Sequence, residues 1–177
     1  MKTRCFWVND SQNYIDYHDE EWGEPVFDDE TLFEFLILET FQAGLSWITI
    51  LNKRKNFRIA FDNFDYTKIA RYSESKYASL LQDAGIVRNK LKIKSAITNA
   101  QLFMEVQKEF GSFSNFIWAY VQGNPIVNHF HKREEVPATT PLSDTISKDL
   151  KKRGFKFVGS TVIYAYMQAV GMVNDHT

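Results

Sequence analysis

The sequence predicts an all-α fold, and three observations support this prediction. Apolar residues recur at helical spacing, as in the segments 32–37 and 47–51. Capping residues stand where these segments begin, because Asp28 or Asp29 can cap the first helix and Ser46 the second. The alternation of apolar and polar residues that is typical of a half-buried strand is scarce.

In chain order, we expect helices over residues 11–20, 29–42, 46–60, 67–72, 74–82, 88–108, 113–121, 143–153 and 160–170. Gly44 follows the second of these helices, and Ser143 and Gly154 bound the eighth as cap and stop. The stretch 122–141 holds three of the four prolines and lacks helical periodicity, so we expect a loop there. That loop is either functional or a simple connection.

Length and composition restrict the class of protein. A chain of 177 residues suits one compact domain, residues 1–177. The net charge of -1 excludes a uniformly basic protein, so binding to nucleic acid would need a local basic face. Cys5 is the only cysteine, which excludes an internal disulfide framework, and the polar start is unlike a signal peptide. These two features favour a reducing cytoplasm, and no apolar run reaches the length of a membrane span, so we expect a cytoplasmic protein without membrane contact. We also expect a monomer.

Residues 80–94 resemble a helix-hairpin-helix element, with two helical runs joined by a tight turn at Gly85. Such a turn directs free amides at the start of the second helix toward a DNA phosphate. The alternative is an ordinary helical hairpin with a solvated basic helix, and this segment alone favours the alternative. The basic residues that follow the turn are Arg88, Lys90, Lys92 and Lys94.

A second basic cluster lies at the end of the expected helix 143–153 and just beyond it. Its members are Lys148, Lys151, Lys152, Arg153 and Lys156. The cluster is either a second phosphate-facing patch or a solvated helix face, and such runs are usually solvated faces.

The first third of the chain concentrates aromatic residues that either a core or a base-stacking pocket would use. They are Trp7, Tyr14, Tyr17, Trp22 and Trp47. Glu39 lies within an apolar helical segment of the same region, so its burial would demand a partner. That partner is either an amide or tyrosine of the protein, or the N–H groups of a ligand such as adenine. The residues alone leave both possibilities open.

Cys5, His18 and His176 are residue types that bind zinc. They are widely separated, and a structural zinc site normally has four protein ligands. Spacing alone therefore favours three unrelated residues.

Six blocks distributed over the chain carry a resemblance to a known family. They read Arg4-Cys-Phe-Trp7, Tyr14-Ile-Asp-Tyr-His-Asp-Glu-Glu-Trp-Gly23, Leu38-Glu-Thr-Phe-Gln-Ala-Gly-Leu-Ser-Trp47, Asp83-Ala-Gly-Ile86, Lys151-Lys-Arg-Gly-Phe-Lys-Phe-Val-Gly159 and Val173-Asn-Asp-His176. Together they resemble the constitutive bacterial 3-methyladenine DNA glycosylases (type I) of the helix-hairpin-helix glycosylase superfamily.

The resemblance implies an all-helical fold in which two lobes flank a base-binding pocket. The N- and C-terminal segments would form one lobe, and a central region of about 46–120 would contain the hairpin near 80–94. Glu39 would recognise the base, with any catalytic contribution secondary to recognition. The pocket walls would come from Trp7, Tyr14, Tyr17, Trp22 and Trp47, and the DNA contacts from Gln42, Gly44, Leu45, Gly85, Arg88 and Lys90.

The implied activity is base-excision repair of alkylated double-stranded DNA by a monofunctional glycosylase that releases free 3-methyladenine. The base would be flipped out of the duplex while Leu45 fills the vacated stack. Because methylation at N3 makes adenine a cation and a good leaving group, no strong general acid is needed. The alternative function is a non-enzymatic protein that binds alkylated DNA or the free base, and a zinc-stabilised structural module is a third.

The resemblance also implies a structural zinc ion bound by Cys5, His18, His176 and a later cysteine, and no organic cofactor. The sequence reads to Thr177 without that cysteine. Loss of one ligand weakens a metal site, so we expect zinc to be held less tightly here.

Overall fold

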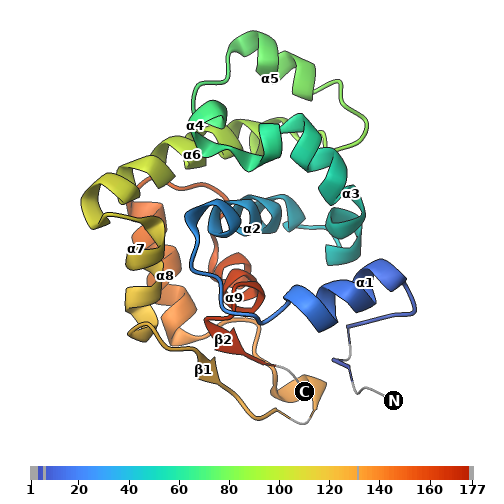
Figure 1. Ribbon diagram of the computed structural model, residues 1–177, viewed down its shortest axis with the longest axis vertical. Coiled ribbons are helices and arrows are strands. Elements are labelled where there is room, and N and C mark those ends of the chain that lie inside the picture. The colour runs from blue at the N-terminus through green and yellow to red at the C-terminus, as the bar shows by residue number, and fades with distance from the viewer. Residues whose placement is uncertain (1–3, 6, 131, 176–177) are drawn as a thin grey trace.

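The computed structural model describes residues 4–5, 7–130 and 132–175 and is almost entirely helical (Figure 1). The longer helices are α2 (Asp29–Gln42), α3 (Trp47–Ala60), α6 (Lys90–Phe110), α8 (Pro141–Lys152) and α9 (Ser160–Ala169). The shorter helices are α1 (Gln12–Asp16), α4 (Tyr66–Ile69), α5 (Glu74–Leu80) and α7 (Phe113–Trp118). Single turns are the π-turn η1 (Tyr17–Glu21) and the 3₁₀ turns η2 (Asp62–Phe64), η3 (Ala119–Val121) and η4 (Arg133–Glu135). The all-α prediction is confirmed.

The starts of α2 and α3 have the predicted caps. Asp28 Oδ2 accepts a hydrogen bond from the Thr31 N–H at 2.9 Å, and Ser46 Oγ accepts one from the Thr49 N–H at 3.4 Å. Between the two helices, Gly44 has a φ of +81°, a conformation that glycine adopts without steric cost. The chain therefore turns sharply where α2 ends and α3 begins.

The start of α8 differs from the prediction, because Ser143 is not its cap. Thr140 takes that position, and its hydroxyl accepts the Ser143 N–H at 3.1 Å. Ser143 Oγ in turn accepts the Thr140 N–H at 2.8 Å, which completes a capping box. Pro141 occupies the first helical position, where the absent N–H leaves no bond unmade.

The stretch 122–141 is not wholly irregular, which corrects the loop prediction. It contains the strand β1 (Ile126–Val127) and the turn η4. β1 pairs in parallel with β2 (Val173–Asn174) in the register Ile126 to Val173. A two-residue pairing with a distant partner leaves no periodicity in the local sequence, so the pattern of residues did not indicate it. The pairing holds the middle of this stretch against the C-terminal segment (Figure 1).

The core is built around α2. Every residue from 32 to 41 on this helix is buried, so it has no polar face. Such a helix is stable only when neighbours cover it on all sides. α3, α6, α7 and α9 pack against it, and α2 lies at the centre of the molecule in Figure 1.

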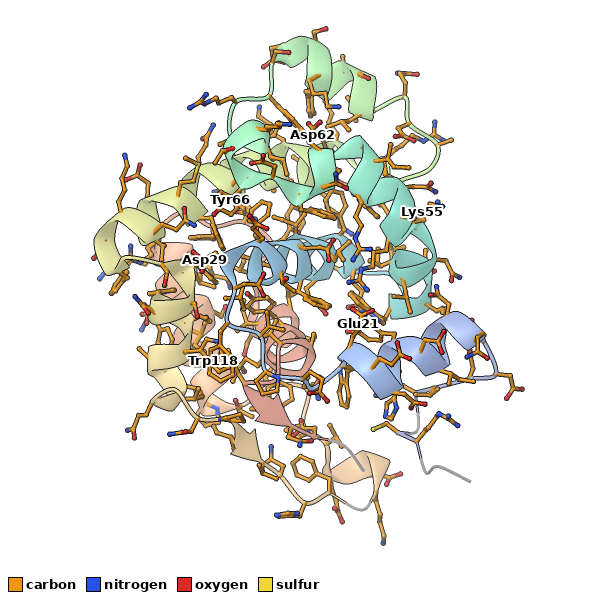
Figure 2. All side chains as sticks on the ribbon, in the orientation of Figure 1. Glu21, Asp29, Lys55, Asp62, Tyr66 and Trp118 are labelled. Atoms are coloured by element: carbon orange, nitrogen blue, oxygen red, sulfur yellow. The ribbon has the colours of Figure 1, made fainter. Side chains whose placement is uncertain are left out.

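Asp29 joins the start of α2 to the start of α7 (Figure 2). Its carboxylate accepts the Phe113 N–H at 2.9 Å and the Ser114 N–H at 2.8 Å. The Gln107 side-chain amide, from α6, donates to the same carboxylate at 2.8 Å. A negative charge at a helix N-terminus is favourable, so Asp29 ties three helices together.

We predict that Asp29→Ala lowers the free energy of unfolding by about 2 kcal/mol, since it removes charge-assisted hydrogen bonds and leaves two amides without an acceptor. Glu30→Ala is the matched control, because Glu30 is exposed in the same helical turn. Urea unfolding of both variants checks this. Equal losses in the two variants would show that Asp29 does not link the helices energetically.

Candidate functional site

A cavity of about 370 Å³ brings the predicted pocket residues together. Its aromatic walls are Trp7, Tyr14, Tyr17, Trp22 and Trp47. Glu39 and Gln42, from the last turns of α2, also line it. The volume and the mainly apolar wall are those of a site for a small planar ligand.

The aromatic rings contact one another around Trp7. Its ring centre lies 5.0 Å from that of Tyr14, 5.1 Å from that of Trp22 and 6.1 Å from that of Tyr17. Trp47, from the start of α3, reaches the same group through Tyr17, at 5.4 Å between ring centres. Tilted and edge-on contacts of this kind stabilise a rigid aromatic cluster. The cavity therefore has walls that are preformed for stacking.

Glu39 is a buried polar group of the cavity. Its side chain is 3 % exposed, and within the described part of the chain its Oε2 atom has no hydrogen-bond partner. Burial raises the pKa of this carboxyl to about 8, because a charged carboxylate is poorly solvated there. The indole Nε1 of Trp47 is also buried with no acceptor among the described residues. Two buried polar atoms at one cavity thus lack partners among the described residues, and a ligand in the cavity would explain both.

Glu34, on the same helix, shows that burial alone does not dictate this state. Although desolvation would raise its pKa, the Arg58 hydrogen bonds and the charges of Arg54 and Arg58 lower it. Arg58 Nε donates to Glu34 Oε1 at 2.6 Å, and Arg54 to Oε2 at 3.1 Å. Arg54 also pairs with Glu21 between the N-terminal helical turns and α3. Among the described residues, cations thus pair with the buried carboxylate of Glu34 but not with that of Glu39.

The far wall of the cavity was missed by sequence reasoning. It consists of Val136, Pro137, Ala138, Ala165, Gln168 and Asp175. The proline-containing stretch was a signal for residues 136–138, since a long segment without periodicity is frequently functional, and Asp175 lies in one of the blocks that carry the family resemblance. Asp175 is held by Asn128, Gln168 and Tyr164, each of which donates to its carboxylate. It therefore presents a fixed carboxyl to a cavity whose other walls come from the first third of the chain.

The turn after α2 lies at the cavity mouth. Gln42 lines the cavity, while the Leu45 side chain is 40 % exposed beyond Gly44. Lys92, from α6, donates through Nζ to the Phe41 carbonyl at 2.8 Å and to the Ala43 carbonyl at 2.5 Å. This bond corrects the grouping of Lys92 with surface lysines, because the residue is only 6 % exposed. Its cation satisfies the end of α2 and fixes the turn.

The hairpin between α5 and α6 spans residues 81–89, longer than the tight turn that was predicted. Gly85 lies so close to α3 that a Cβ there would be 3.1 Å from Asn56, and its amide donates to Asp83 Oδ1 at 2.8 Å. That amide is therefore not available to a phosphate. The amides of Lys90 and the next residue open α6 and have no helical acceptor, and Arg88 and Lys90 are exposed beside them.

Two of the three predicted zinc ligands contact each other. Cys5 Sγ and His18 Nε2 are 3.2 Å apart, and both residues are buried. Asp19, which pairs with Arg4, accepts from His18 Nδ1 at 2.9 Å, the arrangement that orients zinc-binding histidines. His176 lies outside the described residues, and within them no three potential ligands are grouped to hold a metal. The zinc site stays a prediction.

The part of the chain that the structure describes contains no helix long and apolar enough to cross a membrane.

Comparisons with known proteins agree on one family. The model of the methyladenine glycosylase family matches residues 7–177. A DNA-3-methyladenine glycosylase of Haemophilus influenzae is 47% identical over 176 residues, which cover 99% of this chain and 95% of the relative. A crystal structure of a 3-methyladenine DNA glycosylase I superposes with a TM-score of 0.96 at 47% identity, over 98% of this chain and 96% of the other. A variant of such an enzyme in complex with 3-methyladenine gives a TM-score of 0.92 at 33% identity, over 95% and 90%.

We predict opposite pH dependences of stability for two glutamine variants. The pKa of Glu39 is raised on folding, so the unchanged protein loses stability as pH rises from about 4.5 to about 8, and Glu39→Gln removes this loss. The pKa of Glu34 is lowered, so its contribution is present above the unfolded value, and Glu34→Gln is destabilising at neutral pH. Denaturant titrations between pH 4 and 9 measure both. Parallel curves for Glu39→Gln and the unchanged protein would contradict the neutral buried carboxyl.

Proposed function

The chain belongs to the methyladenine glycosylase family, and we propose that its aromatic cavity receives a 3-methyladenine base flipped out of alkylated DNA. The activity is that of a DNA-3-methyladenine glycosylase, which hydrolyses the N-glycosidic bond of this base in base-excision repair. The observation that carries the site assignment is the buried Oε2 atom of Glu39, which has no hydrogen-bond partner among the described residues and lies at a cavity with aromatic walls.

Charge is the basis of recognition in this proposal. Methylation at N3 gives the adenine of the nucleoside a positive charge, which the π-faces of Trp22 and Trp47 attract. The exocyclic amine of the base donates to Glu39, whose carboxyl then ionises beside the cation. Ordinary adenine lacks the charge, so it leaves Glu39 neutral and gains much less. The cavity therefore selects the lesion through a carboxyl that is neutral when the cavity is empty.

The reaction follows from the same charge. The bond between C1′ and N9 breaks, and its electron pair goes to the base and neutralises the cation. Water adds its oxygen to C1′ and loses a proton, which leaves an abasic site and free 3-methyladenine. Because the leaving group is already activated, stabilisation of positive charge on the sugar matters more than protonation of the base. Within the described structure no lysine lines the cavity, which supports hydrolysis without strand cutting.

The exposed elements at the cavity mouth supply the DNA contacts. Leu45 projects from the turn after α2, at a position suited to fill the stack that a flipped base vacates. Gln42 and Gly44 form the base of this projection. Arg88 and Lys90 flank the open amides of α6, which suits a phosphate of the duplex backbone.

Zinc would have a structural role. Cys5 and His18 fit two ligand positions, because His18 presents Nε2 to the cysteine sulfur while Nδ1 bonds Asp19. His176 would be the third protein ligand. The ion would tie the segment around Cys5, which carries Trp7 into the cavity, to the C-terminal segment.

We predict that excision depends on the ionisation of Glu39. For the unchanged protein, kcat/KM for release of 3-methyladenine from methylated duplex DNA rises with pH toward a plateau with a midpoint near pH 8, the pKa of the free carboxyl. Glu39→Gln flattens this profile and lowers the plateau by about 10- to 100-fold, the loss of one charge-assisted hydrogen bond. Glu30→Gln, an exposed carboxylate of the same helix, serves as the control. If Glu39→Gln kept the pH profile of the unchanged protein, Glu39 would have no role in recognising the base. If no form of the protein released 3-methyladenine, the proposed activity would be rejected.

We predict substoichiometric or chelator-labile zinc in the purified protein. Metal analysis by mass spectrometry, before and after dialysis against a chelator, measures it. Cys5→Ser is expected to abolish zinc binding and to lower the melting temperature. If the protein held no zinc, the same substitution would affect only the packing around residue 5. Absence of zinc from protein grown with excess metal would reject the site.

A further inference from the structure

The turn between α8 and α9, residues 155–158, is held against α6 (Figure 1). The fully buried Asn99 of α6 makes two hydrogen bonds to the backbone of Lys156, donating to its carbonyl at 3.0 Å and accepting from its N–H at 2.9 Å. An asparagine that satisfies both backbone groups of one residue fixes that residue in space. The turn therefore has a set position relative to the hairpin helix.

The same turn carries backbone strain. Phe157 has a φ of +57°, a left-handed conformation that a bulky residue seldom adopts. The buried Ser147 of α8 donates to the Val158 carbonyl at 2.6 Å, so the residue after the strained one is also fixed. Strain of this kind persists where surrounding bonds impose it, and it clusters at functional positions. None of these residues lines the aromatic cavity, so the pocket does not explain the strain.

The turn and α6 together form a shallow depression of about 430 Å³. It is lined by Leu91, Lys94, Ser95, Thr98, Lys156 and Phe157. Both lysine side chains are exposed, and neither has an ion-pair partner among the residues that the structure describes. No acidic residue belongs to the lining. The side chains of Lys94 and Lys156 thus place two positive charges at this depression.

The depression is continuous with the hairpin. Lys90, Lys94 and Thr98 are spaced by four residues and share one face of α6, so Lys94 lies about 6 Å along the helix from Lys90. Lys156 extends this row of positive charge onto the neighbouring turn.

We propose that Lys94 and Lys156 form a second contact to the DNA backbone beside the hairpin. The inference rests on the proposed function, because DNA is the substrate. The partner is the phosphate backbone of a duplex, since the lining offers two exposed cations and apolar side chains, while its two hydroxyls, those of Ser95 and Thr98, donate to backbone carbonyls of α6. The fixed turn gives Lys156 a defined position beside α6. The contact is independent of sequence and of the lesion.

The test is the salt dependence of binding to an undamaged duplex oligonucleotide, measured by fluorescence anisotropy from 50 to 300 mM NaCl. Each phosphate contact contributes about 0.9 to the slope of log Kd against log salt concentration. We expect Lys94→Gln and Lys156→Gln each to lower the slope by nearly this amount, and the double variant by about 1.5 to 2. Excision from methylated duplex should lose kcat/KM in proportion to Kd while kcat at saturating DNA stays unchanged.

Lys108→Gln is the matched control, because it removes the same charge from an exposed lysine of α6 about 27 Å beyond Lys90. Its slope should stay near that of the unchanged protein. A double variant that behaves like this control would overturn the proposal, even when excision is intact. Failure of the unchanged protein to release 3-methyladenine would instead reject the proposed function, and the binding slopes would still decide whether the two lysines contact DNA.

Discussion

The burial of α2 on every side is the constraint from which the fold and the site follow. Because α2 has no polar face, it is stable only when α3, α6, α7 and α9 pack around it. A carboxylate buried within this helix must be paired with a cation or hydrogen-bond donors, or else it becomes protonated and neutral. Glu34 finds two arginines, whereas Glu39 faces a cavity and has a pKa of about 8. In the proposed function, a ligand that brings positive charge offsets the energetic cost of burying Glu39.

The other parts of the site depend on the same helix. Its last turn places Glu39 and Gln42 at the cavity, and Lys92 fixes its end from the helix that follows the hairpin. The buried ammonium group of Lys92 thus connects α6, which we propose to contact the DNA backbone, with the turn that carries the exposed Leu45. In this account, recognition of a cationic lesion and distortion of the duplex are two consequences of how α2 ends.

Sequence reasoning reached the parts of the site that are local in the chain. The aromatic residues and Glu39 lie within its first third, and an acid inside an apolar helix was a visible anomaly. The far wall was beyond reach, because Asp175 and residues 136–138 meet the pocket only through long-range packing. Lys92 was grouped with exposed basic residues for the same reason, because a lysine in a basic run is normally exposed. Its burial is explained only by the carbonyl acceptors of Phe41 and Ala43, which are far from it in the sequence. The family resemblance supplied roles that composition and periodicity could not.

The central claim is that Glu39 is neutral in the empty cavity and ionises when a cationic base enters. The direct measurement is the pH titration of its side-chain carboxyl carbon by NMR, assigned by comparison with Glu39→Gln, without and with an adenine alkylated at both N3 and N9, which keeps its charge. The account predicts a midpoint near pH 8 for the empty cavity and a markedly lower one in the complex. A midpoint near that of an ordinary glutamate in the empty cavity, unchanged by the cation, would contradict it.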